Sequence, residues 1–142
     1  MSHGFRRALA LLLILGLLGS FLELMLFAHH EDTLQMIPLV LIGTALCACA
    51  ALSFHPGRAT LRMFQLVMTL LIAGGLLGIG LHLRANLEFQ TEIDPGLHGW
   101  TLLTKSLHAK APPALAPAML AWLGLLGLVL AQGHARHGKP QP

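Results

Sequence analysis

Residues 8–28 read ALALLLILGLLGSFLELMLFA, and this stretch decides the fold because its 21 residues carry one charged side chain, that of Glu23. A transmembrane α-helix needs roughly 20 apolar residues, since each residue rises about 1.5 Å through a hydrocarbon core about 30 Å thick. The run within residues 9–18 does not alternate apolar and polar side chains, as a strand of a membrane barrel would. It is also longer than the apolar core of a signal peptide, so we expect the segment to stay in the protein.

Three further stretches pass the same test of length and polarity. With the first, the expected spans are residues 8–28, 34–54, 63–83 and 114–131. A helix satisfies every backbone N–H and C=O within its own segment, which a bilayer requires. The sequence therefore predicts one domain, residues 1–142, with an all-α fold: an integral membrane bundle of four transmembrane helices.

The composition excludes the common soluble classes. Charged residues make up 11% of the chain and hydrophobic residues 55%, whereas soluble domains carry about 25% charged residues. The sequence contains no nucleotide-binding loop, no Ser/His/Asp set and no redox CxxC pair, so we expect no enzyme. The net charge of +3 is spread over the membrane anchors and predicts no nucleic-acid partner. Cys47 and Cys49 lie two residues apart on one expected helix, point to different faces, and are expected to fill space.

The positive residues indicate how the chain is oriented. Six Lys and Arg residues fall on the side of the N-terminus and three on the other side. The first group is Arg6, Arg7, Arg58, Arg62, Arg136 and Lys139; the second is Arg84, Lys105 and Lys110. By the positive-inside rule both termini face the cytoplasm, and residues 29–33 and 84–113 are extracytoplasmic. The expected location is a bacterial inner (plasma) membrane, crossed several times.

The link over residues 84–113 is long for a structureless loop. Residues 84–93 can continue the third helix until Asp94-Pro95-Gly96, although Leu83, Ala85, Leu87 and Phe89 also alternate as in a short strand. After Gly96, apolar residues recur at helical spacing: Leu97, Trp100, Leu103 and Leu107. This pattern predicts a short extracytoplasmic amphipathic cap, with Trp100 at the depth of the headgroups.

Glu23 is the most informative polar residue, since it lies about five positions inside the outer end of its span. An acid within a membrane normally faces the bundle and has a partner. The candidates are His30, seven residues on, and His82, at the outer end of the third span. Glu23, His30 and His82 thus form an expected intramembrane polar site. Its role is either structural, fixing helix packing, or functional, handling a proton, ion or ligand.

The outward histidines and acids form a second candidate site. Imidazole and carboxylate groups together suit transition metals. The expected ligands are His29, His30, Asp32, His82 and Glu88. The spacing contains neither a His-xxx-His pair nor an HExxH motif, so a polar rim without metal is the alternative. No cofactor is otherwise expected.

Small residues mark the helix faces expected to pack closely. Gly74 and Gly78 form a small-xxx-small pair, and Gly124 and Gly127 lie one turn apart on the fourth span. Small side chains let helix backbones approach where lipid gives no hydrophobic drive for association. Packing within the bundle is one interpretation, and a glycine face left for a partner is the other.

The chain resembles small bacterial four-helix membrane proteins over most of its length. The matching stretches are Glu23-Leu24, His29-His30-Glu31-Asp32, LQMIPLVL at 34–41, Asn86-Leu87-Glu88-Phe89 and Pro113-Ala114-Leu115-Ala116-Pro117. This resemblance implies the four-helix fold and no activity. The chain is also similar to small multidrug exporters, which have four helices and one Glu in the first. Here Glu23 lies nearer the membrane surface, the third link is longer, and the charge bias is one-sided.

Two functions are therefore expected. The first is a small accessory or scaffold subunit that packs against partner membrane proteins or its own copies within the lipid bilayer. The alternative is a small transporter or metal- or ion-binding membrane protein that uses Glu23 and the outward rim.

Overall fold

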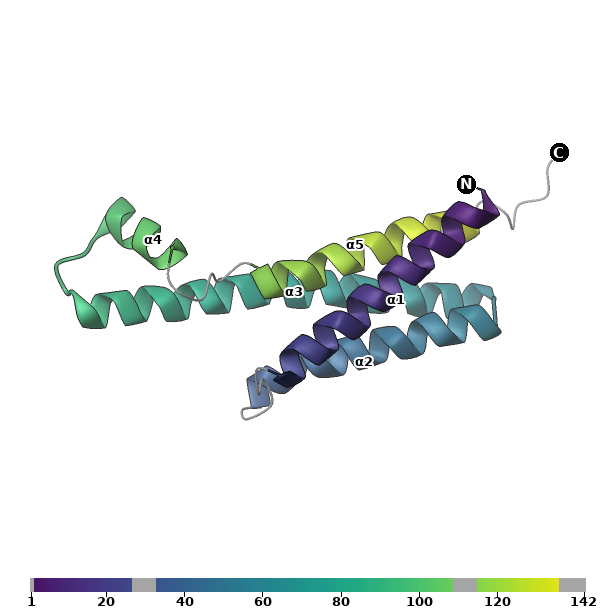
Figure 1. The fold of residues 1–142 in the computed structure, drawn as a ribbon, viewed down its shortest axis with the longest axis horizontal. Helices are drawn as coiled ribbons and strands as arrows, with labels where there is room; N and C mark the ends of the chain where they lie inside the picture. The colour runs from purple at the N-terminus through teal and green to yellow at the C-terminus, as the bar shows by residue number, and fades with distance from the viewer. Residues whose placement is uncertain (1, 27–32, 109–114, 136–142) are drawn as a thin grey trace.

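The computed structural model describes residues 2–26, 33–108 and 115–135, and within these ranges it is entirely helical (Figure 1). The helices are α1 (His3–Leu26), α2 (Thr33–Phe54), α3 (Arg58–Ile93), α4 (Gly99–Leu107) and α5 (Leu115–Ala135). Four of them, all except α4, are long and apolar enough to cross a membrane. The predicted all-α architecture with four candidate spans is confirmed.

Helix α3 is much longer than the span predicted for it. Its 36 residues extend about 54 Å, well beyond a hydrocarbon core of about 30 Å. The helix continues over residues 84–93, as the helical alternative predicted, and the short strand does not form there. Two features support the continuation: an i,i+4 ion pair between Arg84 and Glu88, and the absence of Gly and Pro from residues 81–94.

The four long helices pack around one core. The most extensive contact joins α3 to α5, followed by α2 with α3, while α1 packs on α5 and α2. In Figure 1, α1 crosses the bundle obliquely instead of running parallel to α5. The largest fully buried apolar side chains come from α1, α2 and α3: Leu13, Leu17, Ile42, Phe64, Met68 and Leu71.

Four helix ends gather at one end of the bundle. The start of α1, the end of α2, the start of α3 and the end of α5 lie together there (Figure 1), and residues from all four line one pocket. The start of α1 and the end of α5 therefore lie at the same end of the bundle, as the charge distribution predicts. Which side is cytoplasmic remains a prediction of the positive-inside rule.

The cap turns back on the extension of α3. Asp94 ends α3, and its Oδ1 accepts a hydrogen bond from the Gly96 N–H at 3.1 Å. Gly99 has a φ of 58°, in the left-handed region that glycine adopts without strain. Helix α4 then packs on α3: the side-chain amide of Asn86 donates to the carbonyl oxygen of Ser106 at 3.2 Å, and Ser106 is fully buried. The predicted short helix is present, and its extracytoplasmic position remains a prediction.

Candidate functional site

Glu23 lies in the last described turn of α1, where its side chain is exposed. The helices packed against α1 are mainly α5 and α2, whereas His82, one of the expected partners, is an exposed residue of α3. His30, the other expected partner, lies outside the described residues. The structure therefore places Glu23 on the surface of the bundle near one end, and it does not bring Glu23 and His82 together in the core.

The expected metal rim is covered only in part by the described residues. His29, His30 and Asp32 lie outside them, while His82 and Glu88 are both exposed on α3. Glu88 accepts a hydrogen bond from Nε of Arg84 at 2.8 Å. This ion pair was not expected from the sequence, although the i,i+4 spacing indicates it. Within residues 2–26, 33–108 and 115–135, no group of three or more His, Cys, Asp or Glu residues could hold a metal ion.

The glycines of α5 lie against α3 with almost no space. A Cβ added at Gly124 would come within 2.6 Å of the carbonyl oxygen of Met68 and 2.7 Å of Cγ1 of Ile72. A Cβ at Gly127 would meet the side chain of Met68, with Cγ at 2.6 Å and Sδ closer still. Gly124 therefore lets α5 approach the backbone of α3, and Gly127 leaves room for the side chain of Met68.

Three glycines of α3 face two different neighbours. A Cβ at Gly74 would lie 2.6 Å from Cδ1 of Leu41 on α2, and one at Gly78 would lie 3.0 Å from Cβ of Pro117 on α5. The tightest backbone contact is at Gly75, where a Cβ would be 2.6 Å from the Pro117 carbonyl oxygen and 2.7 Å from the Ala121 nitrogen. The small-xxx-small rule singled out Gly74 and Gly78 and missed Gly75, because the rule does not say which face meets which helix.

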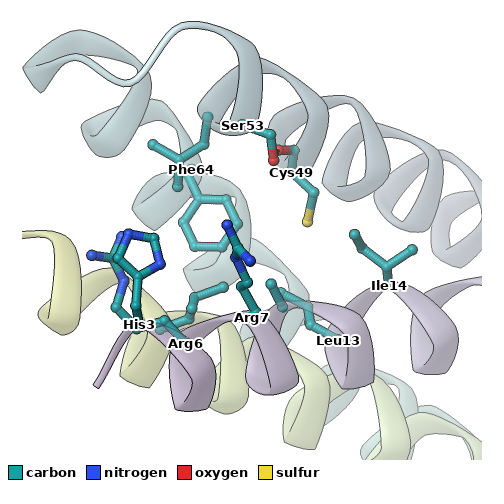
Figure 2. A pocket seen from close by; sticks show the side chains of 11 residues that line it. His3, Arg6, Arg7, Leu13, Ile14, Cys49, Ser53 and Phe64 are labelled. Atoms are coloured by element: carbon teal, nitrogen blue, oxygen red, sulfur yellow. Dashed lines mark hydrogen bonds between the residues drawn. The ribbon is translucent and has the colours of Figure 1, made fainter. Parts of the chain in front are cut away.

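A pocket of about 290 Å³ opens at the end of the bundle where the four helix ends gather (Figure 2). Its polar lining residues are His3, Arg6 and Arg7 from α1 and Ser53 from α2. Its other lining residues are Ala10, Leu13, Ile14, Cys49, Leu52, Phe64 and Leu130. The pocket is thus cationic along the start of α1 and mainly apolar further into the bundle, with no acidic residue in its lining.

Arg6 has an unusual environment within this pocket. Its Nε is buried, and among the described residues it has no hydrogen-bond partner. Figure 2 shows the side chains of His3, Arg6 and Arg7 rising from α1 toward the ring of Phe64. From the sequence the two arginines were expected only as membrane anchors, because neither helical periodicity nor charge counting shows what lies across from them.

Taken together, the described residues form an all-helical bundle with four candidate transmembrane helices. This architecture is typical of a membrane protein. No protein-family model, no curated protein and no solved structure matches the chain.

Proposed function

We propose that the chain is a small accessory or scaffold subunit of a bacterial inner membrane, with both termini cytoplasmic, that packs against other membrane proteins. The observation that carries this proposal is a face of small residues on α2. A Cβ at Gly43 would meet nothing within 4 Å, and Cys47 and Ala51, one and two turns further on, are exposed. These three residues, called here the α2 small-residue face, have no helix against them in the described part of the chain.

Small residues are the usual contact points between membrane helices, because they let backbones approach closely. The exposed surface of α1 is bulkier, since between Leu11 and Leu22 Gly19 is the one small residue among exposed leucines: Leu11, Leu12, Leu15, Leu18 and Leu22. Large apolar side chains suit contact with lipid. The contrast between the two helices supports a protein partner, or a second copy of the chain, on α2.

Co-purification from native membranes tests the proposal, with stoichiometry measured by mass spectrometry. We expect a partner subunit or a second copy to be retained by the wild-type chain and by Ala73→Leu, whose exposed site on α3 lies beside Leu70 and Leu77. Gly43→Leu should release that partner, because a large side chain separates the two helices. Retention by all three chains would contradict docking on the α2 small-residue face.

The same preparation separates the alternative function. Glu23 and the outer histidines predict a small transporter or an ion-binding protein. That function would be supported by a stoichiometric transition metal in a preparation that holds no other protein. A partner without metal supports the accessory role.

A further inference from the structure

We propose that the pocket between the start of α1 and the ends of α2 and α5 binds one anionic phospholipid, with the phosphate at Arg6 and Arg7 and part of one acyl chain over Phe64. The proposal goes beyond the accessory function and shares with it only the predicted cytoplasmic position of the N-terminus. Three observations carry it: the buried Nε of Arg6, which has no hydrogen-bond partner among the described residues, the separation of polar from apolar lining, and the position of the pocket along the helices.

The lining that the described residues give the polar part of the pocket is basic. Nε of Arg6 is buried without a hydrogen-bond partner in the described residues, and Arg7 and His3 lie on the same side of the pocket. A buried donor without a partner is unfavourable. A phosphate offers several acceptor oxygens, and the planar guanidinium group is suited to bind it. No acidic side chain lines the pocket to fill that role.

The deeper part of the pocket suits a hydrocarbon chain. Leu13 and Phe64 line it and are almost fully buried, and Ile14 and Leu52 lie beside them. The volume of about 290 Å³ is at the lower limit of sites that enclose a whole small molecule, which occupy about 300–1,000 Å³. The pocket therefore holds a headgroup and a length of one chain, while the rest of the lipid remains in the bilayer.

The pocket also has a suitable extent along α1. Its α1 lining runs from His3 to Ile14, which spans about 16 Å at the helical rise. This distance connects the headgroup region to the hydrocarbon core. The predicted topology puts the arginines at the cytoplasmic surface, where basic pockets between transmembrane helices bind anionic headgroups.

Two simpler ligands fit less well. A zwitterionic lipid brings a cationic group close to Arg6, Arg7 and His3. Free phosphate satisfies the arginines and leaves the apolar lining unused. The charge and the apolar surface are both used only when an acidic headgroup and an acyl chain belong to the same molecule.

Native mass spectrometry of the full chain in detergent tests the proposal. The probes are dioctanoyl phosphatidylglycerol, dioctanoyl phosphatidylcholine and inorganic phosphate. We expect one phosphatidylglycerol to bind at least about tenfold more tightly than phosphatidylcholine, since each basic residue near the headgroup strengthens binding of an anionic lipid. Millimolar inorganic phosphate should not displace the lipid.

The variants separate the pocket from general surface charge. Arg6→Gln with Arg7→Gln should weaken phosphatidylglycerol binding at least about tenfold. Arg58→Gln with Arg62→Gln removes the same charge at the same end of the bundle, outside the lining residues, and should change binding by less than about threefold. Ala10→Phe, which fills the pocket without removing charge, should weaken the lipid and leave the weak binding of phosphate unchanged.

Several results would overturn the proposal: equal binding of the two lipids, equal losses in the two double variants, or displacement by phosphate, which would identify a phosphate site instead. If the double variant does not fold, Arg7→Gln alone gives the answer. Arg7 is exposed, so its replacement leaves no buried gap. Unchanged phosphatidylglycerol binding in that variant would likewise contradict an arginine-held headgroup.

Discussion

Replacing Gly75 by alanine should weaken the bundle, because the backbone of α5 lies directly against this residue of α3. The added Cβ would lie 2.6 Å from the Pro117 carbonyl oxygen and 2.7 Å from the Ala121 nitrogen. Ordinary contact begins at 3.4 Å, so the first distance is too short by about 0.8 Å. Both neighbours are backbone atoms, which cannot move aside as a flexible side chain can.

The magnitude follows from comparison with a second glycine on the same helix. A Cβ at Gly80 would meet nothing within 4 Å. Both Gly→Ala changes gain the same helix propensity, up to about 1 kcal/mol, so that contribution cancels in the difference between the two variants. What remains is the overpacking at Gly75, typically about 1–3 kcal/mol. We therefore expect Gly75→Ala to be less stable than Gly80→Ala by about 1–3 kcal/mol.

Unfolding of the purified chain in mixed micelles, followed by circular dichroism as the fraction of sodium dodecyl sulfate rises, measures this difference. Gly80→Ala should unfold at or slightly above the wild-type midpoint and Gly75→Ala clearly below it. Equal midpoints for the two variants would refute the close backbone contact between α3 and α5.

The remaining predictions concern the cap, the membrane orientation and Glu23. Asn86→Ala should release α4 from α3, because the hydrogen bond to the Ser106 carbonyl oxygen is lost. The rate of amide hydrogen exchange over residues 99–107 should then rise. An unchanged rate would show that apolar packing alone holds the cap. A cysteine at Thr104, in a background without other cysteines, should be labelled from outside intact cells; labelling only after permeabilisation would reverse the topology. Glu23→Gln should leave folding intact, since the side chain is exposed; a loss of stability in this variant would instead reveal a partner for the Glu23 carboxyl group.

The fold was predictable from the sequence because the length of an apolar run determines whether a helix can span a bilayer. Helix α2 begins at Thr33 and ends at Phe54, within one residue of the expected span. The bounds of α3 were less predictable from its membrane span. Residues 84–93 are polar enough to lie outside the membrane, yet they continue the helix. Hydropathy detects where a helix leaves lipid, whereas Pro95 and Asp94 determine where the helix ends.

The candidate site was less accessible to sequence reasoning. The pocket exists because α1 crosses the bundle obliquely and brings Arg6 opposite residues of α2 and α3. The crossing angle depends on where small residues let the helices approach. For example, Gly16 of α1 faces the side chain of Leu123 of α5. A hydropathy pattern gives the apolar face of a helix but not its angle to a neighbour. Glu23 was singled out because a charged residue within an apolar span is easily recognised. Whether its side chain is exposed depends on the angle between α1 and its neighbours.

The length of α3 has a mechanical consequence. The helix is a continuous rod that runs from one end of the bundle through the span to the cap, and no proline interrupts it. Membrane helices tilt when the bilayer is thinner than their apolar stretch. With a pivot near Gly74, the far end of α3 is about 29 Å away along the axis, so a tilt of about 10° moves the cap sideways by about 5 Å. The cap would thus report bilayer thickness to whatever lies beside it, with no rearrangement inside the bundle.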